Sequence, residues 1–508
     1  MPTPSRLWRV CKEHVLGTRF EMLVNSPSGA LAKLAVRAAR EEIERLNNVL
    51  NDRRDSAEIS KLNRDRRIDA SEDLFAVLQL GETWRKISRG AFDGRMGELV
   101  RLWASHEPDR LAIDRALAAL RDSSVTLDSS GRSVELSSTI MLSLDAVAKG
   151  YVVDAAFNAA RRAAPLIEGL AVCIGGDLRC FGESPHASGW RIGIPNPTIL
   201  AENAPLADAV AVRNGSVATS GRGPRDCTGN GYRSTTISPF TGRPVREVVS
   251  ASVVASHAAD ADAIATACLV LRPEESIAWI DRLDGVAARI TDFRGGVHES
   301  LRWQPMRLAA MSSEQALQRN AASRTATGKT ASAGTKQIDK SANNKPSLSP
   351  EQRWPADWEV GVTYLEPEIK DLSAGYTNPY VAVWITDADN KPVSTVLLLG
   401  RDEEWHHDNF VWWGSYGTRA VQLVDLLSRS TSLSGRYQVY WNGTDDDSKP
   451  VSTGRYTIHL ETNQEHGVHT YRSMPIEIGR ERFNVSLPNQ KEDGGLKITY
   501  GHYNEREY

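Results

Sequence analysis

The sequence has few cysteines, no long apolar run and almost no net charge, and each shortage excludes a class of protein. No run of ~18 apolar residues occurs, so no segment is expected to span a bilayer. Lysine and arginine number 61 and aspartate and glutamate 64, a formal net charge of −3, which gives no electrostatic basis for a nucleic-acid or anionic-membrane partner. With 41% hydrophobic and 25% charged residues, the composition is that of an ordinary globular protein.

Cysteine is scarce and shows no pairing pattern. The five cysteines include no C-x-x-C pair, so neither a disulfide framework nor a zinc site is expected, and each is interpreted as a small buried hydrophobe in a reducing compartment. Residues 1–22 carry some positive charge but no apolar core and no cleavage site, so a cytoplasmic location is expected. The cysteines are Cys11, Cys173, Cys180, Cys227 and Cys268.

A long polar stretch divides the chain. Residues 311–352 are rich in serine, alanine, threonine, lysine and asparagine, and they cannot bury enough surface to offset their ordering entropy. A length of 508 residues is also enough for two to four domains. The predicted organisation is a first domain over 14–308, a flexible linker over 309–352, a second domain over 353–480 and a C-terminal tail over 481–508.

The two sides of this linker have different patterns. Before it, helices are predicted over 31–50, 74–87 and 260–271, and β-branched strands over 170–174, 190–194, 209–212 and 248–255. Their alternation lacks the regularity of a doubly wound sheet, so the predicted class is α+β. After it, short strands over 380–385, 394–399, 436–441 and 455–461 predict a small all-β sandwich.

Two glycine-containing segments are candidates for phosphate or ligand contact. In AVAKGYVVD, residues 146–154, Lys149 precedes Gly150 at a turn into a helix, where an ammonium can lie beside a phosphate; the alternative is a solvated turn. In IGGDLRCFG, residues 174–182, Gly175 and Gly176 end a buried strand that a ligand can approach closely. The alternative there is a tight turn capped by Asp177.

Two further segments supply oxygen atoms. SVATSGRG, residues 216–223, is either a hydroxyl-and-glycine loop that donates hydrogen bonds to anionic oxygens or a polar hairpin turn. In ADAIATACLVL, residues 261–271, the i, i+4 spacing of Asp262 and Thr266 puts both oxygens on one helix face. Mg²⁺ takes such oxygens and completes its octahedron with water and phosphate. The alternative is a carboxylate interacting with the helix dipole and a core hydroxyl.

Taken in order, these segments resemble the ApbE family of magnesium-dependent FAD:protein FMN transferases. The resemblance covers roughly residues 14–308, and the order and spacing of the blocks carry it, since each block alone is weak. The blocks are Gly17-Thr18, AEISKLN (57–63), AFDGRMGELVRLW (91–103), AVAKGYVVD, IGGDLRCFG, SVATSG, TGRPV (241–245) and ADAIATA.

The resemblance implies an activity and its participants. Such enzymes cleave the pyrophosphate of FAD, release AMP and leave FMN in phosphodiester linkage to a threonine or serine of a target flavoprotein. Because the transfer occurs at phosphorus, catalysis is expected to depend on positioning and on charge stabilisation by Mg²⁺. The sequence does not identify the target protein or the oligomeric state.

The resemblance also implies the site residues. Asp262 and Thr266 would bind Mg²⁺ through side-chain oxygens and Ala146 through its backbone carbonyl. Lys149 would pair with a phosphate or flavin oxygen, and Lys149 and Asp262 would be catalytic. The positions implied to contact FAD are Leu16, Ala91, Phe92, Asp93, Lys149, Gly175, Gly176, Asp177 and Thr236.

The chain departs from the family pattern at three places. The family's S-H-I-I-D-P-x-T-G aligns with residues 234–242, where Thr235 replaces the histidine and Ser238 the aspartate. An imidazole accepts a hydroxyl proton near neutral pH, whereas a threonine does not. Ser143 replaces an acidic residue, with Asp145 nearby in a different register, and residues 222–231 also differ. Binding of FAD and Mg²⁺ is therefore better supported than efficient transfer.

The second domain resembles the family of unknown function DUF2271. Residues 378–399 and 440–458 carry this resemblance, and the latter is also similar to the immunoglobulin-like domain of flagellar hook-capping proteins. The acidic run 445–447 is interpreted as an exposed hairpin loop, with no metal assigned. An aromatic cluster, mostly expected in the core with a part available to a partner, comprises Trp405, His406, His407, Trp412 and Trp413.

Three functional hypotheses follow. The first is an active transferase that modifies a separate flavoprotein, with the β domain presenting or recognising that target. The second is an FAD pyrophosphatase that gives FMN and AMP, with water replacing the protein hydroxyl. The third is a catalytically impaired FAD-binding protein whose second domain is an interaction module. The chain has no good match to the acceptor motif of flavinylated proteins, so self-modification is not expected.

Overall fold

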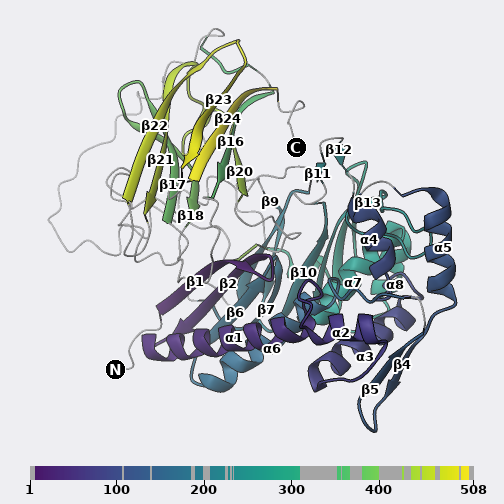
Figure 1. Cartoon of the computed structure of the whole chain (residues 1–508). Helices are drawn as coiled ribbons and strands as arrows, with labels where there is room; N and C mark the ends of the chain where they lie inside the picture. The colour runs from purple at the N-terminus through teal and green to yellow at the C-terminus, as the bar shows by residue number, and fades with distance from the viewer. Residues whose placement is uncertain are drawn as a thin grey trace.

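A computed structural model describes two parts of the chain (Figure 1). The predicted linker residues 309–351, the aromatic cluster at 405–413 and Asp447 lie outside the described residues. The described residues are 6–105, 108–137, 140–184, 189–197, 206–222, 227–228, 231–232, 234–308, 352–355, 357–366, 380–399, 426–427, 436–446, 449–463, 469–490 and 494–502.

An eight-stranded antiparallel sheet forms the centre of the N-terminal part. Its strand order is β1-β2-β6-β7-β10-β13-β14-β15, so segments far apart in sequence are neighbours. Strands β6 and β13 are buried along their whole length, which explains their unbroken apolar pattern. The bounds are β1 Arg6–Val15, β2 Thr18–Ser26, β6 Gly169–Ile174, β7 Asp177–Gly182, β10 Gly215–Gly221, β13 Val248–Ala255, β14 Ala287–Asp292 and β15 Val297–Glu299.

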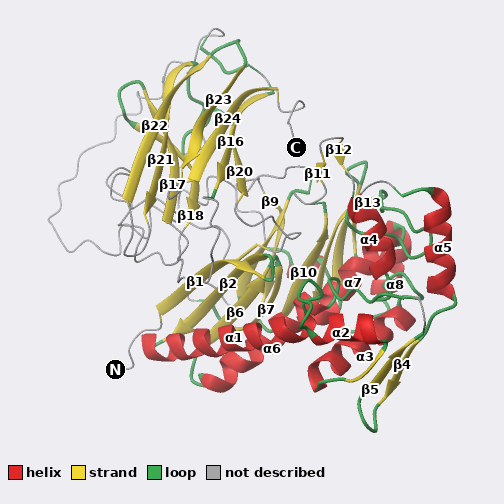
Figure 2. Cartoon of the chain, viewed as in Figure 1, coloured by secondary structure: helices red, strands yellow, loops and turns green. Residues whose placement is uncertain are grey.

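Helices cover one face of this sheet (Figure 2). Helix α1 packs against β2 and α6, α6 against β6 and β7, and α7 against β10 and β13. The predictions of helices over 31–50, 74–87 and 260–271 are confirmed by α1, α3 and α7. The helices of this layer are α1 Gly29–Leu50, α2 Glu58–Asp65, α3 Glu72–Ile87, α6 Ala148–Ala163, α7 Ala258–Val270 and α8 Pro273–Ile280.

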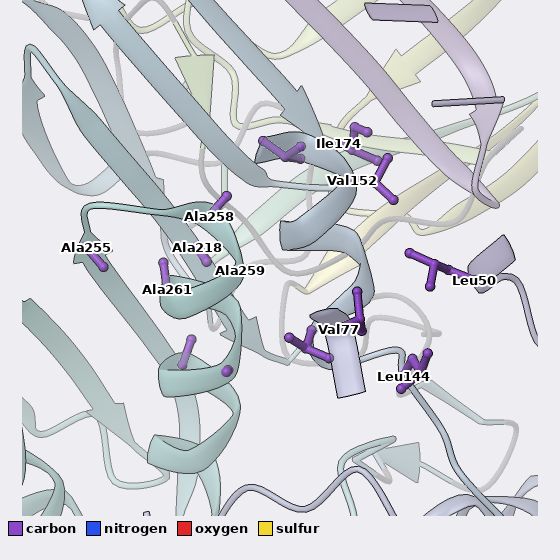
Figure 3. Close-up of a cluster of buried hydrophobic side chains, with 14 of the residues drawn as sticks. Leu50, Val77, Leu144, Val152, Ile174, Ala218, Ala255, Ala258, Ala259 and Ala261 are labelled. Carbon is purple, nitrogen blue, oxygen red and sulfur yellow. The ribbon is translucent and has the colours of Figure 1, made fainter. Parts of the chain in front are cut away.

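Helix α7 lies at the centre of this layer and is buried on all sides. Ten of its residues are buried, six of them alanines, and Figure 3 shows Ala258, Ala259 and Ala261 in the same cluster as Val152 of α6. The small side chains let the helices approach closely. A Cβ added at Gly150 of α6 would lie 2.4 Å from the Ala258 carbonyl oxygen. The glycine of the AVAKGYVVD segment is therefore required for contact between two helices.

A smaller sheet covers the opposite face. Strands β8, Trp190–Pro195, and β9, Leu206–Val212, are antiparallel and pack against the central sheet through side chains such as Trp190, Ile192 and Leu178. Strand β19, Leu426–Leu427, pairs with β8 in parallel. The second half of the chain therefore contributes a strand to the first.

Smaller elements surround the end of the sheet near α2 and α3. Helices α4, Gly97–Ser105, and α5, Arg110–Arg121, form an apolar cluster with Ile237. The other elements are the sheet of β3 Arg67–Asp69, β5 Ser133–Leu136 and β4 Val125–Asp128, the ribbon of β11 Cys227–Thr228 and β12 Gly231–Tyr232, and the 3₁₀ turn η2 Gln304–Met306.

The C-terminal part contains two four-stranded sheets around their own apolar core, so the predicted all-β sandwich is confirmed. One sheet has the order β20-β16-β24-β23 and the other β18-β17-β21-β22. The strands are β16 Trp358–Leu365, β17 Tyr380–Asp387, β18 Pro392–Leu399, β20 Arg436–Trp441, β21 Gly454–Asn463, β22 His469–Ile478, β23 Phe483–Gln490 and β24 Gly494–His502.

The predicted domain ends differ from the structure at both termini. Residues 481–508 were expected to be a tail, but β23 and β24 complete one sheet of the sandwich, and β24 pairs with both β16 and β23. At the other end, β1 begins at Arg6, before the expected start at residue 14. Strand β1 pairs with the next strand, β2, in a hairpin that the sequence interpretation did not recognise, whereas β24 pairs with β16, which is distant in sequence.

The structure shows where the cysteines lie and how apolar its helices are. Cys173, Cys180 and Cys268 are buried, as predicted, while Cys11 is half-buried and the side chain of Cys227 lies outside the described residues. Within the described part of the chain, none of the helices is both long and apolar enough to cross a membrane.

Candidate active site

Two tight turns lie side by side at one end of the eight-stranded sheet. The β1–β2 turn is Leu16-Gly17, with φ of 52° and 72°, and the β6–β7 turn is Gly175-Gly176, with φ of 61° and 101°. Positive φ at both central residues is the feature of type I′ hairpins, which glycine adopts without strain. The Gly175 N–H donates to the carbonyl of Arg19 in β2 at 2.9 Å, which holds the second turn two residues from the first. Gly175-Gly176 is thus a tight turn at the end of a buried strand, as the alternative interpretation had it, and the close approach of a ligand stays a prediction.

Lys149 lies beside this end of the sheet, in the first turn of α6. Its Nζ donates to Asp177 Oδ2 at 2.6 Å and lies 3.7 Å from Asp262 Oδ2. The Gly150 N–H donates to the same Asp262 oxygen at 3.3 Å. The Asp177 and Asp262 side chains are only 3% and 2% exposed, whereas Lys149 is 22% exposed. One ammonium group with partial access to solvent therefore links carboxylates from β7 and α7.

The charges of this cluster do not balance. Burial on its own would lower the pKa of Lys149, but the carboxylates of Asp177 and Asp262 outweigh it and raise this pKa above its ordinary value. Burial raises the pKa of Asp262 to about 7, repulsion from Asp177 acts in the same direction, and Lys149 opposes both. Two buried carboxylates therefore share one ammonium, and a further cation would be favourable at Asp262.

The hydroxyl groups of Thr266 and Ser220 extend the cluster along α7 and onto β10. Thr266 lies one helical turn after Asp262, and its Oγ1 is 3.4 Å from Ser220 Oγ on β10. Thr219 Oγ1 and Ser252 Oγ, on β10 and β13, are 2.8 Å apart. The expected loop at 216–223 is wrong for residues 216–221, which belong to β10. This strand pairs with β13 throughout. Because successive strand residues point to opposite faces, Ser220 faces α7 and Thr266, whereas the Thr219–Ser252 pair lies on the other face of the sheet.

The chemistry of these donors fits a hard divalent cation. Among the described residues, no three His, Cys, Asp or Glu side chains form a group that could hold a metal ion. The predicted set is of another kind, since it combines the Asp262 carboxylate, the Thr266 hydroxyl and the Ala146 carbonyl just before α6. All three are oxygen donors, which Mg²⁺ prefers, and Mg²⁺ usually keeps water and phosphate oxygens in its other positions. Because Asp177 and Asp262 share only the Lys149 ammonium, the negative charge that remains would attract such a cation.

The predicted FAD-contacting turn at residues 91–93 adjoins the segment that leads to Lys149. Ala91 and Phe92 are buried, and Asp93 is held by Arg95, whose Nη2 donates to Asp93 Oδ2 at 2.6 Å. The Ser143 N–H donates to the Gly94 carbonyl at 2.9 Å. The turn therefore lies next to residues 143–149, and the Asp93 carboxylate already has a cationic partner.

The segment in which the histidine is replaced forms an ordered turn. Thr235 is exposed, and the Thr236 carbonyl accepts from the Val245 N–H at 3.0 Å. The Phe240 N–H donates to Ser238 Oγ at 3.3 Å, so Ser238 makes the local turn contact that an aspartate makes in an Asx turn. Trp103 Nε1 donates to the Gly242 carbonyl at 2.8 Å. Serine at 238 thus preserves the turn, whereas threonine at 235 supplies no imidazole.

Comparison with known proteins identifies the family of the chain. The model of the ApbE family matches residues 16–290, more than half of the chain. The chain belongs to the ApbE family. A second family, described as "Predicted periplasmic protein (DUF2271)", matches residues 362–494 and therefore spans most of the β-sandwich.

Individual members of the ApbE family agree with this assignment. The chain is 31% identical over 305 residues to the FAD:protein FMN transferase of Treponema pallidum, covering 54% of this chain and 82% of the relative. It is 28% identical to the FAD:protein FMN transferase of Haemophilus influenzae, covering 47% and 73%. Both resemblances confirm the family that the ordered sequence blocks predicted.

Solved structures share the N-terminal fold. The Thermotoga maritima ApbE protein superimposes with a TM-score of 0.53 and 22% identity, covering 60% of this chain and 100% of that chain. The apo flavinyl transferase ApbE of Pseudomonas stutzeri gives a TM-score of 0.52 and 21% identity, covering 60% and 98%. The α+β class of an ApbE-like domain followed by an all-β region is thereby confirmed.

The structure brings together only part of the site predicted for this ApbE domain. Lys149, Asp177 and Asp262 are in direct contact, with Thr266 one turn further along α7. The turns that contain Leu16 and Gly175-Gly176 are neighbours at the same end of the sheet. In the described part of the chain, Thr236 shares no hydrogen bond with the Lys149 cluster, and its role in contacting FAD stays a prediction.

The sequence interpretation gave no role to Asp154 and Arg179. These two residues form an ion pair at 2.9 Å beside the Lys149 cluster, and Asp154 accepts backbone N–H groups of α7. One signal was present in the sequence, since Asp154 is a carboxylate within the otherwise apolar stretch 152–157 of α6. A charge in such a place usually has a buried partner, but its partners come from two distant segments.

Proposed function

We propose that the protein is a Mg²⁺-dependent FAD:protein FMN transferase that attaches FMN through a phosphodiester bond to a threonine or serine of a separate flavoprotein and releases AMP. The observation that carries the proposal is the cluster of Lys149, Asp177 and Asp262, with Thr266 on the same helix. The names of the ApbE relatives supply the reaction class, and the oxygen donors and excess carboxylate support the metal.

The chain's own residues bind and orient the reactants. The Lys149 ammonium, held in place by Asp177, faces a phosphate or flavin oxygen of FAD. Asp262, Thr266 and the Ala146 carbonyl would hold Mg²⁺, which supplies charge stabilisation for the pyrophosphate when bound. The glycines of the 175–176 turn allow the backbone to approach the substrate closely.

The reaction conserves atoms and charge. The hydroxyl oxygen of the target bonds to the phosphorus that carries the riboflavin moiety, and the bond between this phosphorus and the bridging oxygen breaks. AMP leaves with that oxygen, and the hydroxyl proton is released. With threonine at position 235, no imidazole at that position takes the proton near neutral pH, so transfer should be slow unless another base takes it.

The replacement at Thr235 favours two alternatives that keep the FAD site. Attack by water instead of a protein hydroxyl would make the protein an FAD pyrophosphatase that gives FMN and AMP. Loss of catalysis would leave an FAD-binding protein with the β-sandwich as an interaction module. The retained Asp262, Thr266 and Lys149 support the two enzymatic hypotheses, because binding alone does not require a metal beside the phosphates.

The decisive experiment uses the full-length protein with FAD and MgCl₂, with and without a protein domain that bears the acceptor motif of flavinylated proteins. AMP is measured by chromatography and the FMN adduct by mass spectrometry, with Asp262→Ala and EDTA as controls. An FMN adduct that both controls abolish supports the transferase. AMP without an adduct supports the pyrophosphatase, and FAD binding without either product supports the binding protein.

The role of the second domain and the location of the protein belong to the same proposal. We infer that the β-sandwich presents or recognises the target flavoprotein, because the Lys149 cluster is built entirely from the N-terminal part. The cytoplasmic location predicted from the sequence stays untested, and the family that matches the sandwich is described as periplasmic. Fractionation of cells that express the native gene distinguishes the two locations.

A further inference from the structure

A second ion pair joins the same two elements as Lys149 and Asp177. Arg179 of β7 donates from Nη1 to Asp154 Oδ1 of α6 at 2.9 Å, and their side chains are 17% and 12% exposed. In the first pair the cation is on the helix and the anion on the strand, and in the second pair the charges are reversed. Two ion pairs of opposite polarity therefore fasten α6 to β7 beside the site.

Asp154 also holds the beginning of α7. The Ala258 N–H donates to Asp154 Oδ1 and the Ala259 N–H to Asp154 Oδ2, both at 3.0 Å. These residues are the first two of α7, and the N-cap residue His257 makes no side-chain capping bond. A carboxylate from α6 therefore takes the place of the missing cap, where it also interacts favourably with the helix dipole.

This cap lies one turn from the residues predicted to bind the metal. Asp262 follows Ala258 by one helical turn, and Thr266 follows Asp262 by another. Gly150 lets α6 and α7 touch, and the Lys149 ammonium next to it lies 3.7 Å from Asp262. Because a helix moves as a rigid element, a shift of its N-terminus changes the distance of Asp262 and Thr266 from Lys149.

We propose that Asp154 is a positioning residue of the active site, which by capping α7 holds Asp262 and Thr266 at the separation from Lys149 that binding of Mg²⁺ beside the FAD phosphates requires. This inference rests on the proposed function. Asp154 contacts helix α7 and Arg179 and has no contact with the Lys149 ammonium among the described residues. Arg179 neutralises the carboxylate and fixes its direction.

The test measures metal binding directly, without turnover. Mn²⁺ is titrated into the FAD-free full-length protein and followed by electron paramagnetic resonance, and unfolding is followed by circular dichroism. Asp154→Ala should weaken Mn²⁺ binding by about tenfold or more, the range for residues that orient metal ligands. Asp154→Asn should have an Mn²⁺ affinity between those of Asp154→Ala and the wild type, because its amide oxygen replaces one of the two carboxylate acceptors. Arg179→Gln should weaken Mn²⁺ binding less than Asp154→Ala does, because the cap remains.

The matched control is Asp109→Ala. Asp109 caps α5 by accepting the Ala112 N–H at 2.7 Å, and α5 contributes no residue to the site. This variant should lose stability but keep wild-type Mn²⁺ binding. If Asp154→Ala does not fold, Asp154→Asn and Arg179→Gln carry the comparison.

The outcomes separate this inference from the proposed function. Wild-type Mn²⁺ affinity in folded Asp154→Ala, or equal losses in Asp154→Ala and Asp109→Ala, would overturn the positioning role and leave the transferase proposal intact. Weakened Mn²⁺ binding in Asp154→Ala together with no FMN transfer by the wild type would support the positioning role and overturn the transferase. Absence of Mn²⁺ binding by the wild type would overturn both.

Discussion

Thr235 occupies the position of a histidine in the ApbE pattern, on a turn that Ser238 and the Trp103 contact with Gly242 keep in shape. Its side chain is exposed, so an imidazole fits there without repacking the core. We predict that Thr235→His increases the rate of FMN transfer by ~10²-fold, the lower end of the contribution that a general base makes. The measurement is the initial rate of adduct formation on the acceptor domain.

The control for this variant is Thr235→Asn, which adds a polar side chain without a base and should leave the rate unchanged. Equal rates for Thr235→His and the wild type would show that proton removal does not limit transfer. An increase of AMP release without an adduct would show that the imidazole activates water instead.

Lys149 is the charged side chain of the cluster that is accessible to a ligand, since Asp177 and Asp262 are almost fully buried. We predict that Lys149→Met lowers the rate of AMP release by ~10²–10³-fold, the usual effect of removing one electrostatic donor at a transferring group. AMP release at saturating FAD measures this effect. The matched control is Lys61→Met at an exposed position of α2, which should have no effect. A rate within a factor of about 3 of wild type would contradict the role of Lys149.

At the scale of elements, the contact between α6 and α7 decides the geometry of the site. A Cβ on Gly150 would lie 2.4 Å from the Ala258 carbonyl oxygen and 2.6 Å from the Ala259 Cα, both backbone atoms that cannot move aside alone. We predict that Gly150→Ala lowers the free energy of unfolding by ~1–3 kcal/mol, as overpacking does, and also weakens Mn²⁺ binding because the helices separate. Chemical denaturation and the Mn²⁺ titration measure the two effects.

Gly131→Ala is the matched control for this prediction. No heavy atom lies within 4 Å of a Cβ added at Gly131, and its turn is remote from the α6–α7 contact. This variant should match the wild type in stability and Mn²⁺ binding. Wild-type behaviour of Gly150→Ala would show that the two helices can separate without changing the site.

At the scale of the whole molecule, the two parts have separate apolar cores, and the sandwich contains a buried histidine. His459 of the sandwich is buried and stacks on Trp384, with Nε2 2.9 Å from Thr386 Oγ1 and Nδ1 2.7 Å from Tyr471 Oη. Burial lowers the pKa of His459 from 6.5 to about 4. The unfolded chain therefore binds a proton near pH 6.5 that the folded sandwich binds only near pH 4.

The stability of the sandwich should decrease as the pH falls from about 6.5 to about 4. Below that range His459 should cause no further change in stability. The full effect of a shift of this size is at most ~3 kcal/mol. Denaturation of the full chain at a series of pH values, followed by the fluorescence of the sandwich tryptophans, measures it. His459→Gln should reduce the slope in this pH range. An unchanged slope would show that other groups cause the acid sensitivity.

The order of sequence blocks was enough to predict the ApbE family, the α+β class and the i, i+4 pair of Asp262 and Thr266 on α7. Strand β1 was missed although its partner β2 follows it directly in a hairpin, and β24 was missed because its partner β16 is far away in sequence. The loop expected at 216–223 is a strand through Gly221 for the same reason, since pairing with β13 outweighs the local preference of serine and glycine for turns.

The sequence by itself determined the residue types of the site, the helix that presents Asp262 and Thr266, and the polar segment between the two parts, because each depends on neighbours within a few turns of chain. Only the tertiary structure decided that Lys149 meets Asp177 and Asp262, and that Asp154 caps α7. These contacts join α6, β7 and α7, whose positions follow from packing around the central sheet. Contacts between distant segments depend on the fold as a whole, and periodicity in one sequence carries no record of them.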